Sequence, residues 1–166
     1  MSKTPPRTTH GHHGDLVVFL IGMRVNRWWR PDVWLPAFLA MAPMLRELYA
    51  AKAAAERGEA EDPGFLGAWS QVGARGPTVV QYWRSTDDLY RYASDPAAEH
   101  RPAWRAFNAR TRRVPGAVGV WHETYAVPAG GHESIYVDMP VVGLARATSI
   151  VPVALRGERA AERLAS

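Results

Sequence analysis

Apolar and polar positions along the chain follow two different periods, and these periods predict its secondary structure. Short runs rich in branched and aromatic residues are typical of strands, and they occupy 15–23, 65–72, 78–83 and 117–127. Residues 31–57 and 85–112 instead have helical composition, with apolar positions three and four residues apart. Prolines inside these two segments predict kinks or interruptions at Pro36, Pro43, Pro96 and Pro102. The predicted order is therefore β-α-β-β-α-β.

This order predicts an α+β fold of ferredoxin-like βαββαβ topology, in which both helices cover one face of an antiparallel sheet. After the PAGG loop at 128–131, residues 132–137 are expected to form an added C-terminal strand. We expect a disordered polar tail at 1–14, the ferredoxin-like domain at 15–145 and a C-terminal extension at 146–166. Because the predicted strands are apolar on both faces, the second face needs a cover. A partner sheet in a homodimer is the simplest one.

Composition narrows the classes of protein to consider. The chain has no cysteine, which excludes disulfides and thiolate zinc sites. Its longest apolar run, at 16–22, is far shorter than the roughly 20 residues that cross a bilayer. The net charge is +4, but the arginines are scattered along the chain and no nucleic-acid-binding module is recognisable. We therefore expect a cytoplasmic protein with a small-molecule substrate and with neither a nucleic-acid nor a membrane partner.

His100 is the first candidate for chemistry. It belongs to a set of residues at steps of three and four in the second predicted helix, namely Leu89, Tyr92, Pro96, His100, Trp104 and Phe107. We expect this face to turn toward the sheet, where burial among aromatic rings favours a neutral imidazole. Such a ring can bind a metal or accept a proton as a catalytic residue. The alternative is a structural histidine bonded to a backbone carbonyl.

The predicted strand at 117–127 contributes two adjacent polar candidates, His122 and Glu123. Alternation places Glu123 on one face with Trp121 and Tyr125, and His122 on the other face. The two side chains therefore cannot converge on one ligand. One of them can act in a pocket while the other lies at the dimer contact, and the sequence does not say which. A polar pair buried at a subunit interface is the alternative.

Two further clusters could line a pocket. Arg24, Asn26 and Arg27 leave the first strand together with two tryptophans, and arginine presents a planar fork to a carboxylate or propionate. The same arginines could instead stack on the indoles and cap the core. Tyr82 and Trp83 end the third predicted strand and are expected to wall the pocket, or simply to fill the core. The histidines at 10, 12 and 13 predict no more than adventitious metal binding.

The combination of MRVNRWW…WLPAFLAM, VVQYWRS, HRPAWRAFN, GVWHETY and ESIYVDMP resembles the fumagillin-pathway monooxygenase-like family of the dimeric α+β barrel superfamily, over about residues 16–144. Members of this superfamily include cofactor-free monooxygenases and haem-binding enzymes such as the haem-degrading monooxygenases and aldoxime dehydratases. Their haem-degrading branch carries the proximal histidine on the second helix. The resemblance therefore implies His100 as a ligand of haem iron, Trp104 beside the porphyrin, and Arg24 or Arg27 at a propionate.

Three functions are consistent with these residues. The first is a monooxygenase-like oxidoreductase of secondary metabolism that acts on a hydrophobic small molecule, either with haem b or without a cofactor. Its catalytic residues would come from His100, His122 and Glu123, and its substrate pocket from Asn26, Tyr82, Trp83, Phe107 and Trp121. The second is a haem-dependent lyase of the aldoxime dehydratase type. The third is a non-catalytic protein that binds haem or another ligand.

Overall fold

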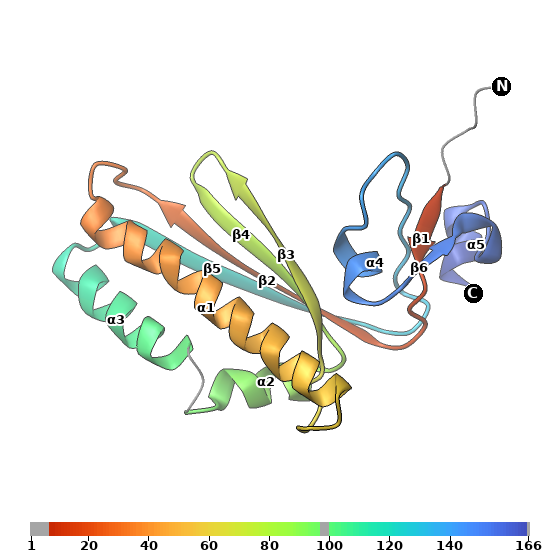
Figure 1. Cartoon of the computed structure of the whole chain (residues 1–166). Coiled ribbons are helices and arrows are strands. Elements are labelled where there is room, and N and C mark those ends of the chain that lie inside the picture. The colour runs from red at the N-terminus through yellow and green to blue at the C-terminus, as the bar shows by residue number, and fades with distance from the viewer. Residues whose placement is uncertain (1–6, 97–99, 166) are drawn as a thin grey trace.

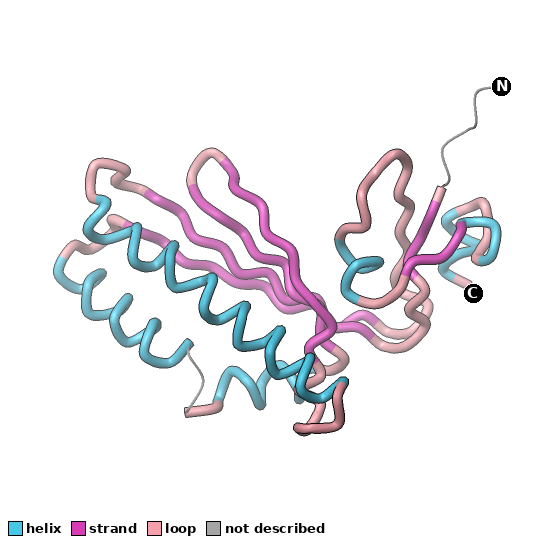
Figure 2. The backbone as a smooth tube through the Cα atoms, viewed as in Figure 1, coloured by secondary structure: helices cyan, strands magenta, loops and turns pink. Residues whose placement is uncertain are grey.

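The computed structural model describes residues 7–96 and 100–165, apart from the side chains of His100 and Ala103. Figure 1 shows its elements in chain order, and Figure 2 separates helices, strands and loops by colour. The strands are β1 (Thr8–His10), β2 (Leu16–Val25), β3 (Phe65–Gly73), β4 (Gly76–Trp83), β5 (Val118–Val127) and β6 (Ile150–Pro152). The helices are α1 (Pro31–Glu56), α2 (Thr86–Ser94), α3 (His100–Arg113), α4 (Gly143–Ala147), the 3₁₀ turn η1 (Val153–Leu155) and α5 (Ala160–Leu164).

The main sheet has the strand order β3-β4-β2-β5, and every neighbouring pair is antiparallel. Together with the chain order of strands and helices, this arrangement confirms the predicted ferredoxin-like α+β fold. Helices α1, α2 and α3 lie along one face of the sheet (Figure 1). No helix within residues 7–96 and 100–165 has the length and apolarity needed to span a membrane.

The helices differ from the sequence prediction in where they break. α1 is one continuous helix from Pro31 to Glu56 that includes Pro36 and Pro43, so the alternative of two consecutive helices is wrong. The second predicted helix is divided into α2 and α3. Asp95 has extended backbone angles, φ −61° and ψ 117°, because the proline that follows disfavours the helical region for the residue before it.

Cross-strand register decides which side chains face the helices. Val17, Phe19, Ile21 and Met23 of β2 point to the helix side, because Val17 packs with Leu48 of α1 and Leu89 of α2. Their direct partners across β4 and β5 therefore point the same way, since opposite residues share a face. The intervening residues of each strand point to the other face, which we call the open face.

Two clusters form the core on the helix side of the sheet. The larger contains Val17, Leu48, Phe65, Trp83 and Leu89. The smaller contains Val33, Ala117 and Val118, at the end where α1 begins and β5 starts. The second cluster ties the end of α3 to the start of α1, because Val114 and Trp34 pack against it.

The two ends of the chain meet in a separate lobe. β1 pairs with β6, and Tyr136 adds an isolated bridge to Thr8. The expected disorder of residues 1–14 is therefore wrong for Thr8–His10, where Thr9 and His10 are almost completely buried. The expected strand at 132–137 is also wrong, because only the Tyr136 bridge forms there. These errors arise because β1 pairs with a segment about 140 residues away, and such a distant pairing produces no local sequence pattern.

The open face is partly covered by this lobe. α4 packs on β3 at Gly67, where a Cβ would lie 2.9 Å from the Cα of Ala147. A glycine at this position therefore lets the α4 backbone approach the sheet closely. Farther along the open face, Trp121 and Tyr125 of β5 remain 40% and 51% exposed.

Candidate functional site

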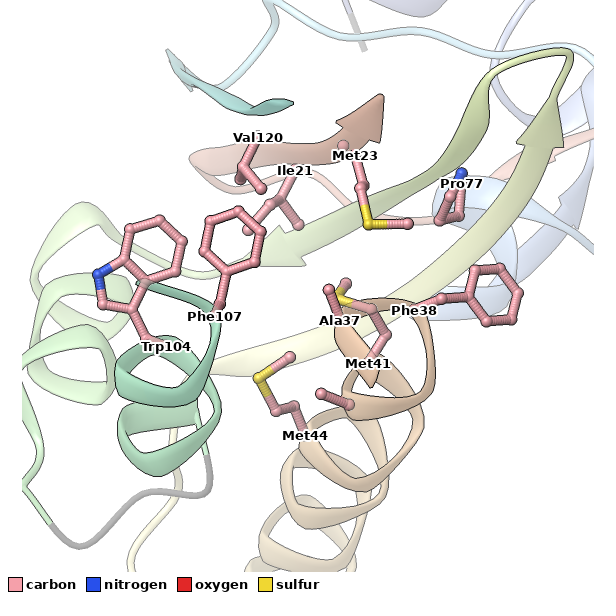
Figure 3. A pocket seen from close by; sticks show the side chains of 12 residues that line it. Ile21, Met23, Ala37, Phe38, Met41, Met44, Pro77, Trp104, Phe107 and Val120 are labelled. Carbon is pink, nitrogen blue, oxygen red and sulfur yellow. The ribbon is translucent and has the colours of Figure 1, made fainter. Parts of the chain in front are cut away.

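A cavity of about 170 Å³ lies between the helix side of the sheet and the two helices α1 and α3 (Figure 3). Residues from four neighbouring elements and from the start of β4 enclose it, and all of them are apolar or aromatic. The lining is formed by Ile21, Gly22, Met23, Ala37, Phe38, Ala40, Met41, Met44, Pro77, Trp104, Phe107 and Val120. This composition suits a hydrophobic small molecule rather than a charged one.

The sheet side of the cavity follows from strand alternation. Ile21 and Met23 are two residues apart on β2, and Val120 lies directly opposite Met23 on β5. All three therefore project to the helix side at one level of the sheet. Their side chains form the wall of the cavity on the sheet side, across from the residues of α1 and α3 (Figure 3).

The helix side leaves space because large and small residues alternate. Ala37 and Ala40 lie on α1 beside Phe38, Met41 and Met44, and their short side chains do not fill the gap to the sheet. From α3, the rings of Trp104 and Phe107 stack with centroids 5.4 Å apart and planes 20° apart. Methionine side chains are flexible and polarizable, so this wall can adapt to ligands of different shape.

Among the described residues, His122 is a titratable side chain that lies beside this cavity on the same face of the sheet. Its direct partner on β2 is Ile21 and its neighbour two residues earlier is Val120, and both line the cavity. The imidazole is exposed, and its ring lies 5.7 Å from that of Phe19. His122 therefore combines access to water with a position next to the apolar walls.

Glu123 lies on the open face, away from the cavity. Its carboxylate accepts a 2.7 Å hydrogen bond from the hydroxyl of Tyr125, and this bond raises the pKa of the Tyr125 phenol. Trp121 projects to the same face, directly opposite Gly22. Of the two residues between which the sequence did not decide, His122 therefore shares a face of the sheet with the cavity walls, and Glu123 lies on the other face.

The remaining predicted pocket residues are spread over the molecule. Arg24 and Asn26 lie beside Gly119 on the open face, where the Arg24 Nε donates to Asn26 Oδ1 at 2.9 Å. Tyr82 is also on the open face; burial raises the pKa of its phenol, and Trp69 donates to its hydroxyl. Trp83 is fully buried in the larger core cluster, and Arg27 is exposed in the loop before α1.

Of the predicted residues, Trp104 and Phe107 line the cavity, whereas the side chain of His100 lies outside the described residues. The backbone places His100 at the first position of α3, one helical turn before Trp104. Sequence reasoning missed the contribution of α1, from Phe38, Met41 and Met44, because apolar residues on a helix usually fill the core. The sequence signal that could have indicated this wall is the three-residue spacing of these large side chains, with two alanines beside them.

Haem b fits poorly with the described walls of this cavity. They contain no imidazole and no thiolate to ligate iron, and no arginine or lysine to hold a propionate. Arg24, the arginine expected at a propionate, lies on the opposite face of the sheet. Among the described residues there is also no group of three histidine or carboxylate side chains that could hold a metal ion.

A second polar cluster lies in the terminal lobe. His10 Nε2 is 2.9 Å from His132 Nδ1, His132 Nε2 is 2.9 Å from the Gly14 carbonyl, and His10 Nδ1 is 2.8 Å from Ser134 Oγ. Since a carbonyl only accepts, His132 Nε2 donates to it. The two buried rings therefore belong to one hydrogen-bonded chain that runs from Ser134 to Gly14.

Burial is the main reason why the pKa of His10 falls from 6.5 to about 4, with the neighbouring His132 and Arg156 adding to it. The Arg156 guanidinium donates to the backbone carbonyls of His10 and His12, so a positive charge stands beside the imidazole. The Ser134 hydroxyl oxygen also lies 3.2 Å from the backbone N–H of His10, which donates to it. These contacts describe a structural network that joins β1 to the segment after β5.

Comparison with known proteins identifies the family. The family model described as "Monooxygenase af470-like" matches residues 16–144, and the chain belongs to this family. Monooxygenase af470 of Aspergillus fumigatus is 27% identical over 149 residues, which cover 83% of this chain and 49% of that protein. The chain thus spans about half the length of this curated relative.

One of two similar solved structures supports the fold. An aldoxime dehydratase (OxdRE) in complex with butyraldoxime aligns with a TM-score of 0.59 at 14% identity, covering 87% of this chain and 40% of that chain. SnoaB, a cofactor-independent oxygenase from Streptomyces nogalater, aligns over 67% of this chain and 91% of its own at 16% identity, with a TM-score of 0.32. The first likeness shows a shared fold, and the second is too slight to carry an argument.

Proposed function

We propose that this chain, as a member of the monooxygenase af470-like family, inserts oxygen into a hydrophobic, electron-rich small molecule bound in the cavity between the sheet and helices α1 and α3. The observation that supports this proposal most is the position of His122 beside an apolar cavity. The apolar walls would hold both the substrate and molecular oxygen away from water. The stacked rings of Trp104 and Phe107 would pack against a planar substrate.

The chemistry requires a base and no protein-derived electrons. The His122 imidazole would remove the proton of an acidic hydroxyl group, and the resulting anion is the electron-rich form that reacts with oxygen. One oxygen atom then enters the substrate, where a CH₂ or its enolic equivalent becomes a carbonyl. The other oxygen atom leaves as water, and the substrate supplies the electrons. The apolar cavity favours the reaction with oxygen because water would solvate the anion, return a proton to it and so lower its reactivity.

We assign no step to haem. The described cavity walls lack a ligand and lack cations for propionates, so the lyase function, which depends on haem iron, has no support from the described residues. Protein that takes up hemin with a Soret band that disappears in His100→Ala would contradict the cofactor-independent proposal. Protein that stays colourless after expression with ample haem would agree with it.

The open face of the sheet is the proposed contact between two copies of the chain. Trp121 and Tyr125 of β5 are exposed there, whereas α4 packs on β3 at the opposite edge of the sheet. Packing of two such faces would bury these rings and form the barrel expected of this superfamily. A Tyr125→Arg variant should shift the mass in light scattering from dimer to monomer. A wild-type protein that is monomeric at high concentration would contradict this assignment.

Oxygen uptake with a polyhydroxylated naphthalene tests the function, with heat-denatured protein as the control for spontaneous oxidation. The His122→Gln variant should lose about 100-fold or more in kcat with little change in KM, as expected for a general base. Glu123→Gln is the matched control, because it changes the adjacent side chain on the opposite face. Equal rates for wild type and His122→Gln would refute the assigned base. Ligand binding without oxygen uptake on any such substrate would favour the binding-protein alternative.

A further inference from the structure

Three turns converge at the end of the domain where α1 begins. The backbone N–H groups of Asn26 and Arg27 both donate to the carbonyl of Ala117, and the N–H of Val25 donates to the carbonyl of Arg75. These bonds join the β2–α1 loop to the α3–β5 turn and to the β3–β4 hairpin. Figure 1 shows the first two at the same end of the sheet. We call residues 24–34, 73–76 and 110–118 together the arginine–tryptophan end.

This end carries the positive charge of the whole chain. Its three stretches contain seven arginines and one aspartate, a formal charge of +6, whereas the full chain has +4. The rest of the chain is therefore net negative by two charges. Asp32 is already paired with Arg30 at 2.6 Å. Arginines that are scattered along the sequence are thus gathered at one end by the fold.

Two indoles project from the same end. Trp28 is 74% exposed and Trp29 58%, although the loop that carries them is well fixed. The Trp34 indole N–H donates to the Trp28 carbonyl at 3.1 Å, and the Arg30 N–H donates to the Arg27 carbonyl. Because these bonds hold the loop in place, the fold itself keeps the two indoles exposed.

The first turns of α1, which follow this loop, also carry exposed apolar side chains. Leu35 is 39% exposed and Leu39 is 58% exposed, and both follow the loop within three turns of the helix. Phe38, which is 37% exposed, is at the same time a wall of the cavity. The exposed apolar surface and the cavity wall therefore meet at one residue.

We propose that the arginine–tryptophan end docks on the surface of a bilayer that contains anionic lipids. Arginine pairs with phosphate groups through its planar fork, and tryptophan favours the headgroup region of a membrane. Exposed leucines gain free energy by entering the hydrocarbon boundary, as in other proteins that lie on a membrane without crossing it. This proposal differs from the expectation from the sequence that the protein has no membrane partner.

Two other occupants fit this end less well. Nucleic acid would use the arginines and could stack on the indoles, but it offers nothing to Leu35 and Leu39. A second copy of the same end would bring two clusters of +6 together, and their repulsion opposes that contact. The arginines in the last turn of α3 also interact favourably with the negative end of the helix dipole. This interaction does not account for Arg27 and Arg75, which lie outside that helix.

A consequence for substrate supply rests on the proposed function, whereas the docking itself does not. A hydrophobic substrate dissolved in the bilayer would reach the cavity past Phe38 without crossing water. Vesicle binding requires no turnover, so failure of the docking and failure of the proposed monooxygenase activity can be told apart.

Co-sedimentation of the full chain with vesicles tests the docking, using phosphatidylcholine alone and with roughly a third phosphatidylserine. The protein should bind the anionic vesicles and lose binding in high salt. Each charge reversal at Arg27→Glu or Arg113→Glu should lower the partition coefficient by about fivefold or more. Arg146→Glu, an exposed arginine of α4, is the matched control and should change little.

The tryptophans are tested with lipids brominated in the acyl chains, which quench only indoles that enter the bilayer. Quenching should occur in wild type and fall in the Trp28→Ala/Trp29→Ala variant, whereas Leu155→Ala, equally exposed in the terminal lobe, should bind normally. Three results would overturn the proposal: equal binding to neutral vesicles, binding to single-stranded nucleic acid without vesicle binding, or loss of a dimer in the tryptophan variant without any vesicle binding.

Discussion

Acid should destabilise the protein through the buried His10, and His10→Gln should remove that part of the pH dependence. The native pKa of His10 is about 4, compared with 6.5 for a solvated imidazole. In this range the unfolded state binds the proton and the native state does not. The contribution of His10 to the free energy of unfolding is therefore complete above pH 6.5 and is lost as the pH falls toward 4. His132, Arg156, His12 and His13 all face His10 and oppose its charge.

The magnitude follows from the two pKa values. The full difference corresponds to about 3 kcal/mol, and the part lost between about pH 7.5 and pH 5 is roughly 2 kcal/mol. Urea unfolding followed by circular dichroism at these two pH values measures it. Other groups titrate in the same window, so the relevant quantity is the difference between wild type and His10→Gln.

The variant should be less stable than wild type at neutral pH, because Ser134 and His132 lose a partner, but its stability should change less with pH. His122→Gln, which changes an exposed histidine of the main sheet that does not act on His10, is the matched control, and its stability should change with pH as that of wild type does. If His10→Gln retains the full wild-type loss of stability in acid, then His10 is not buried as a neutral ring and the argument fails.

Three further substitutions test the packing that positions the cavity. Gly76→Ala should lower the free energy of unfolding in urea by about 2 kcal/mol or more. The reason is that φ is +149° at this position and an added Cβ would collide with a carbonyl of β2. Gly73→Ala in the same hairpin is the control and should cost much less. Ser85→Ala should lower the melting temperature through a loss of about 1 kcal/mol, since its hydroxyl caps α2; an unchanged value would disprove this cap. Trp83→Ala should cost roughly 3–5 kcal/mol in the same assay because the indole is completely buried, and a loss below 1 kcal/mol would be inconsistent with that core.

Sequence reasoning predicted the main sheet because its signals are local. The strand runs and the order of strands and helices specify a ferredoxin-like topology, and alternation on β5 separated His122 from Glu123 correctly. The choice between them needed cross-strand register, which depends on which residue of β2 lies opposite. That information is not contained in either strand alone.

Three features could not be predicted because they depend on distant segments. His10 is buried by residues near 132 and 150, so a polar tail in sequence becomes a strand in the structure. The cavity arises where two alanines of α1 face the sheet, and a helix pattern does not show what lies opposite. The arginines gather at one end only because three turns meet there.

Methyl NMR of methionine tests the central claim, that the cavity between the sheet and helices α1 and α3 is the ligand site. The chain has five methionines, and Met23, Met41 and Met44 line the cavity while Met139 is 58% exposed elsewhere. In protein labelled at the methionine methyl groups, titration with a hydroxylated naphthalene should shift the three cavity signals and leave that of Met139 in place. Ala40→Phe, which fills the cavity, should abolish these shifts. Shifts confined to Met139, or unchanged cavity signals in the presence of a ligand that is turned over, would contradict the account.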